Sequence, residues 1–288
     1  MIRQRLLLTF AILGAITMNV RADEDALRKA VTLYLSFDEA VKADHGAGAL
    51  AFRTRYGEPG KGPYTFEDGF PDKVFTIAKD KGIHGAALEV KEPLPRNGRI
   101  FIPAKGNLAF KKGGWGGAVS FWMKTDPETL LKTKFCDPFQ ITHKGANNGG
   151  IWVDFNDKKP RDFRMGVFPA AKEGQQPIKE DDPQAPLVRV PNPGFKATDW
   201  HHVVVSWNNL DTGRKDAHAM LYLDGKAMGE IKDRELGMDW DVDKAGVYIG
   251  VNYVGLLDEF AVFGRALTAE EVALLKGTPG LLAALRKK

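Results

Sequence analysis

The chain has 288 residues, 43% of them hydrophobic, with 41 Lys or Arg, 37 Asp or Glu and a formal net charge of +4. This apolar share supports a substantial core. The single cysteine, Cys136, excludes an intrachain disulfide, and we expect its thiol to be buried as a small apolar group.

Residues 1–22 are predicted to be a secretory signal peptide. Arg3 and Arg5 precede an apolar run over 6–18, and small residues before position 23 offer a cleavage site. The run is short for a bilayer span, and an uncleaved N-terminal anchor is the alternative. Removing Arg3, Arg5 and Arg21 from the 41 basic residues leaves 38 against 37 acidic residues, a net charge of +1. A chain this close to neutral predicts neither nucleic acid nor an anionic membrane surface as a partner.

One domain is expected over residues 31–277, between a short polar leader at 23–30 and a C-terminal tail at 278–288. Period-2 patterns and turn signals predict short strands at 32–37, 87–90, 99–102, 108–110, 118–124, 139–142, 150–155, 163–168, 200–207, 219–223, 226–231, 247–251 and 257–263. Residues 43–82 are expected to form loops and short edge strands. The polar, proline-containing segment 169–193 either covers a binding face or is a solvated insertion.

A short helix is predicted after the last strand. Thr268 and Glu271 have the spacing of a capping box, and Gly277 with Pro279 supplies the stop. The chain shows no βαβ alternation and no internal repeat. The predicted fold is therefore all-β, an antiparallel two-sheet jelly-roll sandwich that ends in a short helix.

An ordered series of motifs supports a family resemblance. The series runs FDE, GIHGAALEV, GAVSFWMKTDP, WHHVVVSWNN, MLYLDGK, VYIGVN and LLDEFAVFGRALTAEEV. Over residues 31–277 this resembles the laminin G-like group of the concanavalin A-like lectin and glucanase superfamily. The resemblance implies a jelly roll with one concave face, often with a structural calcium, and functions from glycan or protein binding to glycoside hydrolysis.

Catalytic carboxylates are not predicted. Glucanases of the superfamily carry E-x-D-x-x-E on one strand, and no segment here fits that pattern. Asp154 and Asp157 are three apart, and Asp258 and Glu259 are adjacent, so each pair should point to opposite strand faces. The alternating acids at 239, 241 and 243 lie in an expected loop, which is either a solvated acidic loop or a calcium loop. The adjacent His201 and His202 should likewise face opposite sides, and a structural role is expected for both.

Ligand contacts are expected on strand faces opposite the apolar core. Aromatic platforms and polar groups are typical of sugar recognition, which makes Trp122, Trp152, Asp154, Asn252 and Tyr253 the candidate ligand-binding residues. Packing is the alternative role for both tryptophans.

A structural calcium site is the second hypothesis. It places Asp38, at the end of the first strand, beside Asp258, at the start of the last, with Glu259 or Asp44 as helpers. Asp258 is expected to share its strand face with Phe260. The alternative is that Asp38 and Asp258 cap turns or accept hydrogen bonds from backbone amides.

The sequence predicts an exported, non-catalytic binding module whose partner is a polysaccharide or an extracellular or envelope protein. Its expected location is secreted, periplasmic or at the cell surface. The alternatives are a divergent glycoside hydrolase or lyase whose acids come from loops, and a structural adhesion protein of the cell envelope.

Overall fold

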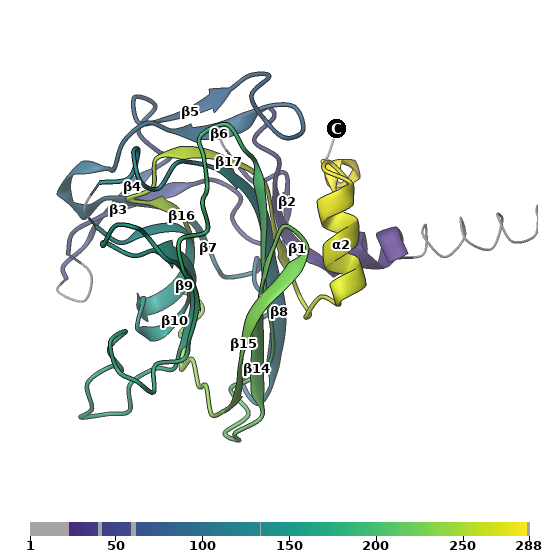
Figure 1. Ribbon diagram of the computed structural model, residues 1–288. Helices are drawn as coiled ribbons and strands as arrows, with labels where there is room; N and C mark the ends of the chain where they lie inside the picture. The colour runs from purple at the N-terminus through teal and green to yellow at the C-terminus, as the bar shows by residue number, and fades with distance from the viewer. Residues whose placement is uncertain (1–22, 40–41, 59–61, 133, 287–288) are drawn as a thin grey trace, which may run out of the picture.

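The computed structural model describes residues 23–39, 42–58, 62–132 and 134–286. Two antiparallel sheets pack face to face, as Figure 1 shows, which confirms the predicted sandwich. The predicted signal peptide at 1–22 lies outside the described residues. Among the residues that are described, no helix is long and apolar enough to cross a membrane.

The first sheet has nine strands in the order β15-β14-β13-β8-β17-β1-β2, with β6 also paired to β17 and β5 to β6. Its strands are β1 (Val31–Leu35), β2 (His45–Gly46), β5 (Phe75–Ala78), β6 (Ala87–Val90), β8 (Trp115–Lys124), β13 (His201–Leu210), β14 (Ala217–Leu223), β15 (Lys226–Arg234) and β17 (Gly255–Phe263). The first and last strands are neighbours, since Tyr34 of β1 pairs with Ala261 of β17.

The second sheet has eight strands in the order β12-β11-β10-β9-β16-β7-β3-β4. Its strands are β3 (Arg53–Tyr56), β4 (Thr65–Asp68), β7 (Arg99–Pro103), β9 (Cys136–Gly145), β10 (Asn148–Phe155), β11 (Phe163–Phe168), β12 (Leu187–Val190) and β16 (Gly246–Val251). The remaining elements are α2 (Ala269–Gly277) and two short 3₁₀ helices, η1 (Pro95–Asn97) and η2 (Ala283–Leu285).

The main core lies between the two sheets and follows the period-2 pattern. Phe121 and Met123 of β8, with Ile151 and Val153 of β10, are fully buried in it. Cys136 is buried there too, and burial raises the pKa of its thiol to about 12, so the thiol stays protonated. This agrees with a packing role.

A second apolar layer covers the outer face of the nine-stranded sheet. Residues 23–30 are helical, and Leu27 is buried with Val272 and Leu275 of α2 against Val204 of β13 (Figure 1). The predicted capping box is present. The Glu271 amide donates to Thr268 Oγ1 at 3.3 Å, and the Thr268 amide donates to Glu271 Oε2 at 2.9 Å.

The strand expected at 108–110 is absent, because this stretch is a turn in the structure. The amides of Asn107 and Leu108 both donate to the Ala104 carbonyl at 2.9 Å. Asn107 Nδ2 also donates to the carbonyls of Ala49 (2.7 Å) and Pro103 (2.9 Å). A buried asparagine side chain therefore takes the place of ladder hydrogen bonds here.

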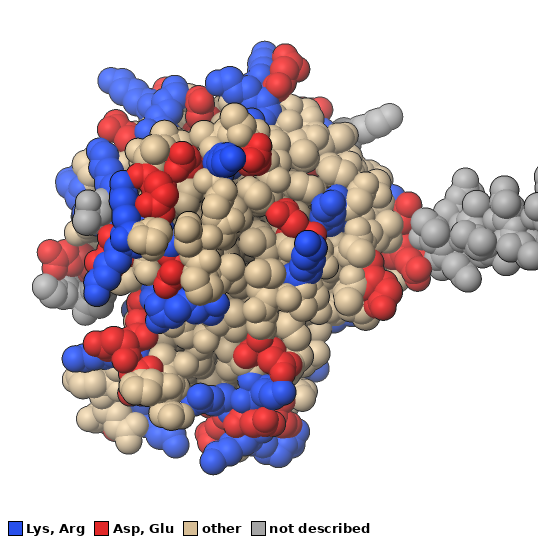
Figure 2. All heavy atoms as spheres, viewed as in Figure 1, with Lys and Arg blue, Asp and Glu red and all other residues tan. Residues whose placement is uncertain are grey.

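Lys and Arg are intermingled with Asp and Glu over the face shown in Figure 2. No large area of one sign dominates that view, in keeping with the nearly neutral charge of the chain without residues 1–22.

Candidate functional site

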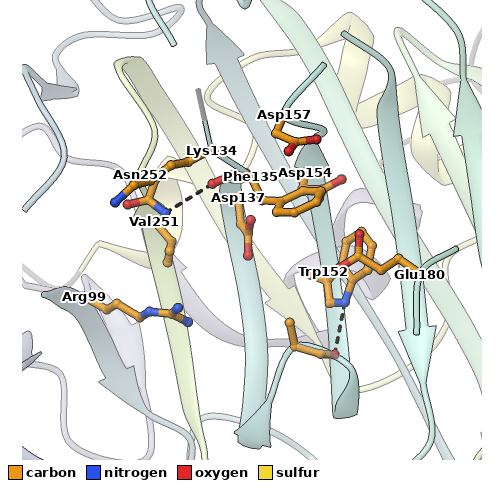
Figure 3. A pocket seen from close by; sticks show the side chains of 11 residues that line it. Arg99, Lys134, Phe135, Asp137, Trp152, Asp154, Asp157, Glu180, Val251 and Asn252 are labelled. Atoms are coloured by element: carbon orange, nitrogen blue, oxygen red, sulfur yellow. Dashed lines mark hydrogen bonds between the residues drawn. The ribbon is translucent and has the colours of Figure 1, made fainter. Parts of the chain in front are cut away.

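A pocket of about 430 Å³ opens on the outer face of the eight-stranded sheet (Figure 3). It crosses the adjacent strands β7, β16, β9 and β10. Since Ile151 and Val153 point into the main core, the alternating Trp152 and Asp154 point out into the pocket. The lining residues are Arg99, Lys134, Phe135, Asp137, Ala146, Trp152, Asp154, Asp157, Glu180, Val251 and Asn252.

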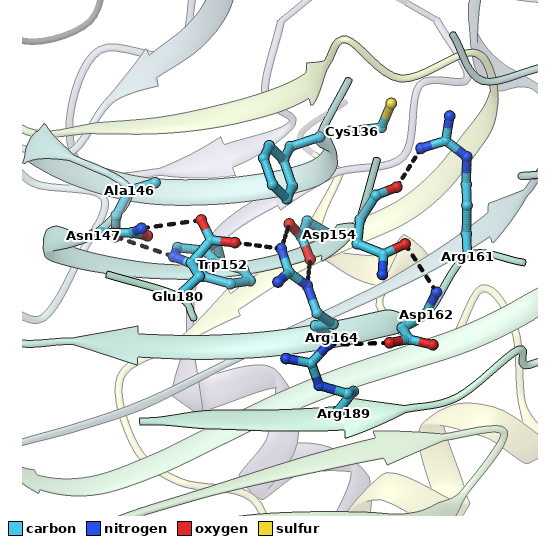
Figure 4. Close-up of polar contacts among 12 residues, drawn as sticks. Cys136, Ala146, Asn147, Trp152, Asp154, Arg161, Asp162, Arg164, Glu180 and Arg189 are labelled. Carbon is cyan, nitrogen blue, oxygen red and sulfur yellow. Dashed lines mark hydrogen bonds and ion pairs between the residues drawn. The ribbon is translucent and has the colours of Figure 1, made fainter. Parts of the chain in front are cut away.

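A buried ion-pair network forms the floor of this pocket (Figure 4). Arg164 Nε donates to Asp154 Oδ1 at 2.8 Å, and its Nη2 binds both Asp154 Oδ2 and Glu180 Oε2, the latter at 2.6 Å. Asn147 Nδ2 donates to Glu180 Oε1 at 3.0 Å. Burial raises the pKa of Asp154 to about 7, and the two hydrogen bonds from Arg164 oppose that rise. The network thus ties the long segment 169–186, which carries Glu180, to the pocket.

Asp137 is a second buried acid in the pocket. Its carboxyl makes no hydrogen bond to any residue that the structure describes, and in Figure 3 the Arg99 guanidinium points toward it. Burial and the charge of Asp154 raise the pKa of Asp137 well above its usual range, while Arg99 acts in the opposite direction. Asp137 is therefore poised to exchange a proton or a hydrogen bond with a bound molecule.

Aromatic rings border the acids. Trp152 stacks on Phe168 at 5.5 Å between ring centroids, and its indole N–H donates to the Ala146 carbonyl at 3.1 Å. Phe135 lies at the pocket rim and is 41% exposed. Across the ladder from Trp152 stands Gly166, where a Cβ would lie 2.3 Å from the indole ring. Glycine at this position lets the indole lie flat on the sheet.

Arg161 fixes the segment that carries Lys134 and Phe135. Its guanidinium is fully buried and donates to the carbonyls of Leu131 (3.2 Å), Lys132 (2.6 Å), Lys134 (3.1 Å) and Asn156. A single side chain thus organises one wall of the pocket.

A second pocket, of about 390 Å³, continues the same face over β3, β7 and β16. Tyr248 of β16 lines this pocket and pairs with Gln140 of β9 on one side and Phe101 of β7 on the other. The lining residues are Arg53, Arg55, Tyr64, Phe66, Phe101, Pro103, His143, Asp243, Lys244, Ala245 and Tyr248. The two pockets form a polar and aromatic tract across six strands, from β10 to β4, which we call the outer-face tract.

Three of the five predicted ligand-binding residues, Trp152, Asp154 and Asn252, line the first pocket. Asn252 has a left-handed backbone (φ +53°), and its Nδ2 donates to the Phe135 carbonyl at 3.2 Å, which fixes the rim. The structure brings neither Trp122 nor Tyr253 to this pocket.

Trp122 and Tyr253 are packing residues in the structure. Trp122 lies on the outer face of the other sheet, buried against the His202 ring at 4.9 Å between centroids. Tyr253 is fully buried in the main core, where its hydroxyl contacts the carbonyls of Leu256 (3.1 Å) and Lys124 (3.3 Å). The turn expected to expose Tyr253 instead folds its ring inward.

The expectation that Asp154 and Asp157 point to opposite faces is wrong, because both line the first pocket. Strand β10 ends at Phe155, so alternation no longer governs Asp157. Asp137 was missed for a related reason. Cys136 and Phe139 are both in the core although three residues apart, so the strand pattern is broken around Pro138.

The pair Asp258 and Glu259 also departs from strand alternation. The β17–β8 register shifts between Asp258 and Ala261, and Glu259 is left-handed (φ +50°), which marks a β-bulge. Leu257 and Phe260 both enter the main core, and Asp258 does not share the face of Phe260. The two acids are consequently close enough for each charge to raise the other's cost of ionisation.

Asp38 and Asp258 both hold the segment 83–86. Asp258 Oδ2 accepts from the amides of Ile83 (2.8 Å) and His84 (3.2 Å), and Asp38 Oδ1 accepts from the Ala86 amide at 2.6 Å. Asp38 also pairs with Arg286. Calcium requires six to eight oxygen ligands. Here amide and guanidinium donors occupy the carboxylate oxygens, so the residues as arranged do not fit a calcium ion.

This arrangement predicts the same melting temperature in millimolar calcium chloride and in chelator, to within about 1 °C, because backbone amides and Arg286 already bind the carboxylate oxygens of Asp38 and Asp258. The measurement is thermal unfolding of the purified chain in both buffers, with Asp38→Asn as the comparison variant. A calcium-dependent rise that Asp38→Asn removes would instead support the calcium site predicted from the sequence.

The acids of the loop 239–243 pair with lysines. Asp239 binds Lys144 (2.7 Å), and Asp241 binds Lys244 (2.9 Å). Over the described ranges, no group of three or more His, Cys, Asp or Glu side chains is placed to hold a metal ion. His201 contacts Asp224 at 2.8 Å, while His202 is buried against Ser120 at 2.8 Å. The adjacent histidines therefore serve separate structural contacts.

Comparison with known protein families identifies the superfamily to which this fold is similar. A laminin G family model, described as concanavalin A-like lectin/glucanases superfamily, matches residues 105–273. None of the curated proteins matches the chain.

Three solved structures illustrate the likeness. The binding domain of botulinum neurotoxin DC in complex with rat synaptotagmin II is 11% identical, with a TM-score of 0.54 over 87% of this chain and 52% of that one. The ligand-binding domain of botulinum neurotoxin serotype D in complex with N-acetylneuraminic acid is 13% identical, with a TM-score of 0.54 over 88% and 52%. This chain thus spans about half the length of those toxin domains.

The third structure is domain 4 of AbnA, a GH43 extracellular arabinanase from Geobacillus stearothermophilus, in complex with arabinotriose. It is 19% identical, with a TM-score of 0.47 over 85% of this chain and 98% of that one.

Proposed function

Because the chain belongs to the concanavalin A-like lectin/glucanase superfamily, we propose that it is an exported binding module that recognises a carbohydrate on its outer-face tract. Export rests on the predicted signal peptide. The observation that carries the proposal is the first pocket, where three residues predicted from the sequence, Trp152, Asp154 and Asn252, meet on one sheet face.

The chemistry of the pocket suits a sugar. A sugar ring offers C–H groups to aromatic faces and hydroxyls to carboxylates and amides, and Phe135 stands at the rim beside Asp157 and Asn252. The side chains of Trp152, Asp154, Glu180 and Asn252 are held by hydrogen bonds and ion pairs before any ligand arrives, which lowers the entropy cost of binding. The continuation into the second pocket gives room for more than one sugar unit.

Replacing Phe135 with Ala is expected to weaken polysaccharide binding at least tenfold, about 1.4 kcal/mol, because the exposed ring is the aromatic contact at the rim. The measurement is affinity for the best polysaccharide from a glycan screen, with product analysis in the same samples to detect hydrolysis or elimination. Met228→Ala is the matched control, since Met228 is similarly exposed (37%) on β15 of the other sheet.

Both variants should keep the parent melting temperature. Equal affinity of Phe135→Ala and the parent would count against the first pocket as the binding site. Release of products that Asp137→Asn abolishes would favour the alternative, a divergent hydrolase or lyase, because Asp137 is the buried acid that makes no hydrogen bond among the described residues.

A further inference from the structure

Arg55 is a buried cation that lacks an acidic partner in the described parts of the chain. It is 7% exposed, and its guanidinium is held between the rings of Tyr64 (4.3 Å) and Tyr248 (4.9 Å to the centroids). Its Nη1 donates to the Tyr248 hydroxyl at 2.9 Å, and its Nε is buried with no hydrogen-bond partner. Ring faces orient the guanidinium plane but do not neutralise its charge.

Arg99 is directly opposite Arg55 in the β3–β7 ladder. Its Nη1 donates to Gln140 Oε1 at 3.1 Å, and it forms no ion pair within 4.0 Å with a described residue. Burial and the nearby charge of Arg55 lower the pKa of Arg99, and the charge of Asp137 acts against this. Two arginines therefore occupy opposite positions of one ladder, and neither forms an ion pair within 4.0 Å with a described residue.

Gln140 adds a third donor at the same place. It is fully buried, and because its Oε1 accepts from Arg99, its Nε2 is the donor end, which has no hydrogen-bond partner among the described residues. A buried donor without an acceptor costs about 1–3 kcal/mol, and a buried unpaired charge costs more. Buried donors without a partner therefore indicate an acceptor that the chain itself does not supply, such as a group of a bound ligand.

Other cations in the second pocket have their own acids. Arg53 pairs with Asp68 at 3.3 Å, and both side chains are exposed or half-exposed. Arg55 lines the second pocket, Arg99 lines the first, and Gln140 is hydrogen-bonded to Arg99; we call these three residues the junction of the two pockets.

We propose that the sugar recognised by this chain is acidic, and that its oxyanion group binds at the Arg55–Arg99–Gln140 junction. This rests on the proposed carbohydrate-binding function. A carboxylate of a uronic acid and a sulfate ester share the required chemistry, because each presents several acceptor oxygens to the fork of a guanidinium. Rings on either side of the junction then contact the neighbouring sugar units.

The test compares charged polymers with their neutral counterparts. Binding of the full chain is measured to polygalacturonate and its fully methyl-esterified form, and to dextran sulfate and dextran, at one ionic strength. We expect one charged polymer to bind at least tenfold more tightly than its neutral counterpart, and the pair that responds identifies carboxylate or sulfate as the group bound. Arg55→Met and Arg99→Met should each remove that preference.

Arg214→Met is the control, because it removes an exposed cation that lies outside both pockets and already has an acid partner, Asp216, at 2.8 Å. It should keep the preference within about twofold, since an exposed ion pair contributes little. The melting temperature of Arg55→Met should match or exceed that of the parent, because this variant removes a buried charge that has no acid partner among the described residues. Arg99 is only half-buried and forms no ion pair within 4.0 Å with a described residue, so Arg99→Met should keep the parent melting temperature.

Equal binding of charged and neutral polymers, with binding still lost in Phe135→Ala, would overturn the acidic-sugar inference and leave carbohydrate binding standing. An equal loss of preference in Arg214→Met would overturn the assignment to the junction. Failure to bind any polymer in the panel, charged or neutral, would overturn both the inference and the proposed function.

Discussion

An Arg164→Met variant is expected to lose about 3–5 kcal/mol of the free energy of unfolding, the range for breaking a buried ion pair by removing one partner. Arg164 is 3% exposed, and its guanidinium binds the carboxylates of Asp154 and Glu180. Methionine fills much of the volume but leaves Asp154 buried without its ion-pair partner. Because Glu180 also loses its anchor, the segment 169–186 should loosen and polysaccharide affinity should fall.

The matched control is Arg189→Met. Arg189 lies opposite Arg164 in the β11–β12 ladder, but it is half-exposed and its ion pair with Asp162 is 3.2 Å long. Its replacement should cost no more than about 1 kcal/mol. Chemical denaturation of both variants measures the two free energies. Combining Arg164→Met with Asp154→Leu should recover part of the loss, because no buried charge is then left unpaired.

Similar losses for Arg164→Met and Arg189→Met would contradict a buried network at the floor of the pocket. No recovery in the double variant would show that the lost energy comes from packing around the long side chain rather than from the stranded charge.

Regular strands made much of this molecule predictable from its sequence. Alternation in 118–124 and 150–155 placed Phe121 and Val153 in the core and Trp152 and Asp154 on the opposite face. The capped helix α2 also follows from the sequence pattern, whereas the pairing of the first and last strands, β1 and β17, is expected from the family resemblance.

Interrupted strands and distant loops made the rest of the site unpredictable. Pro138 and the bulge at Asp258 each shift the pattern by one residue, so alternation assigns Asp258 to the wrong face and gives no indication that Asp137 belongs to the pocket. Glu180 reaches the pocket from a segment without strand pattern, and Arg55 and Arg99 meet only because β3 and β7, more than forty residues apart in the chain, pair in one sheet. Spacing in the sequence carries no signal for such a meeting.

The stability of the chain should increase as the pH falls from about 8.5 to about 6.5. The cause is the pair of buried acids at the β17 bulge. Burial and the neighbouring charge of Glu259 raise the pKa of Asp258 to about 8, and burial raises the pKa of Glu259 to about 7, with a hydrogen bond from the Tyr34 hydroxyl (2.8 Å) acting against it.

The direction of this change in stability follows from whether the folded or the unfolded chain binds more protons. Unfolded carboxyls have a pKa near 4, so between pH 4 and pH 8 the folded chain binds more protons than the unfolded chain. The stabilisation is complete below the unfolded pKa and is lost as the pH rises through the folded values of about 7 and about 8. Uptake of one proton across 1.5 pH units contributes about 2 kcal/mol, or roughly 4–8 °C in melting temperature.

A buried histidine limits the gain at lower pH. Burial lowers the pKa of His202 to about 4, so between about pH 6.5 and pH 4 the unfolded chain binds one proton that the folded chain does not, which offsets part of the gain from the acids. The melting temperature should therefore continue to rise below pH 6.5, but less than the two acids alone would produce. Asp154, whose pKa is raised to about 7, adds to the rise in the same direction.

The decisive comparison is the melting temperature against pH for the parent, Asp258→Asn and Glu259→Gln. Each variant replaces one acid with a neutral group of the same shape, so the neighbouring acid loses its like charge and the slope between pH 8.5 and 6.5 should fall to about half. Ser120→Ala, which removes the contact of the hydroxyl with His202, leaves both acids intact and should keep the parent slope in that range. A flat profile in the parent would show that both carboxyls are ionised at neutral pH, with the amides of Ile83 and His84 stabilising the charge at Asp258.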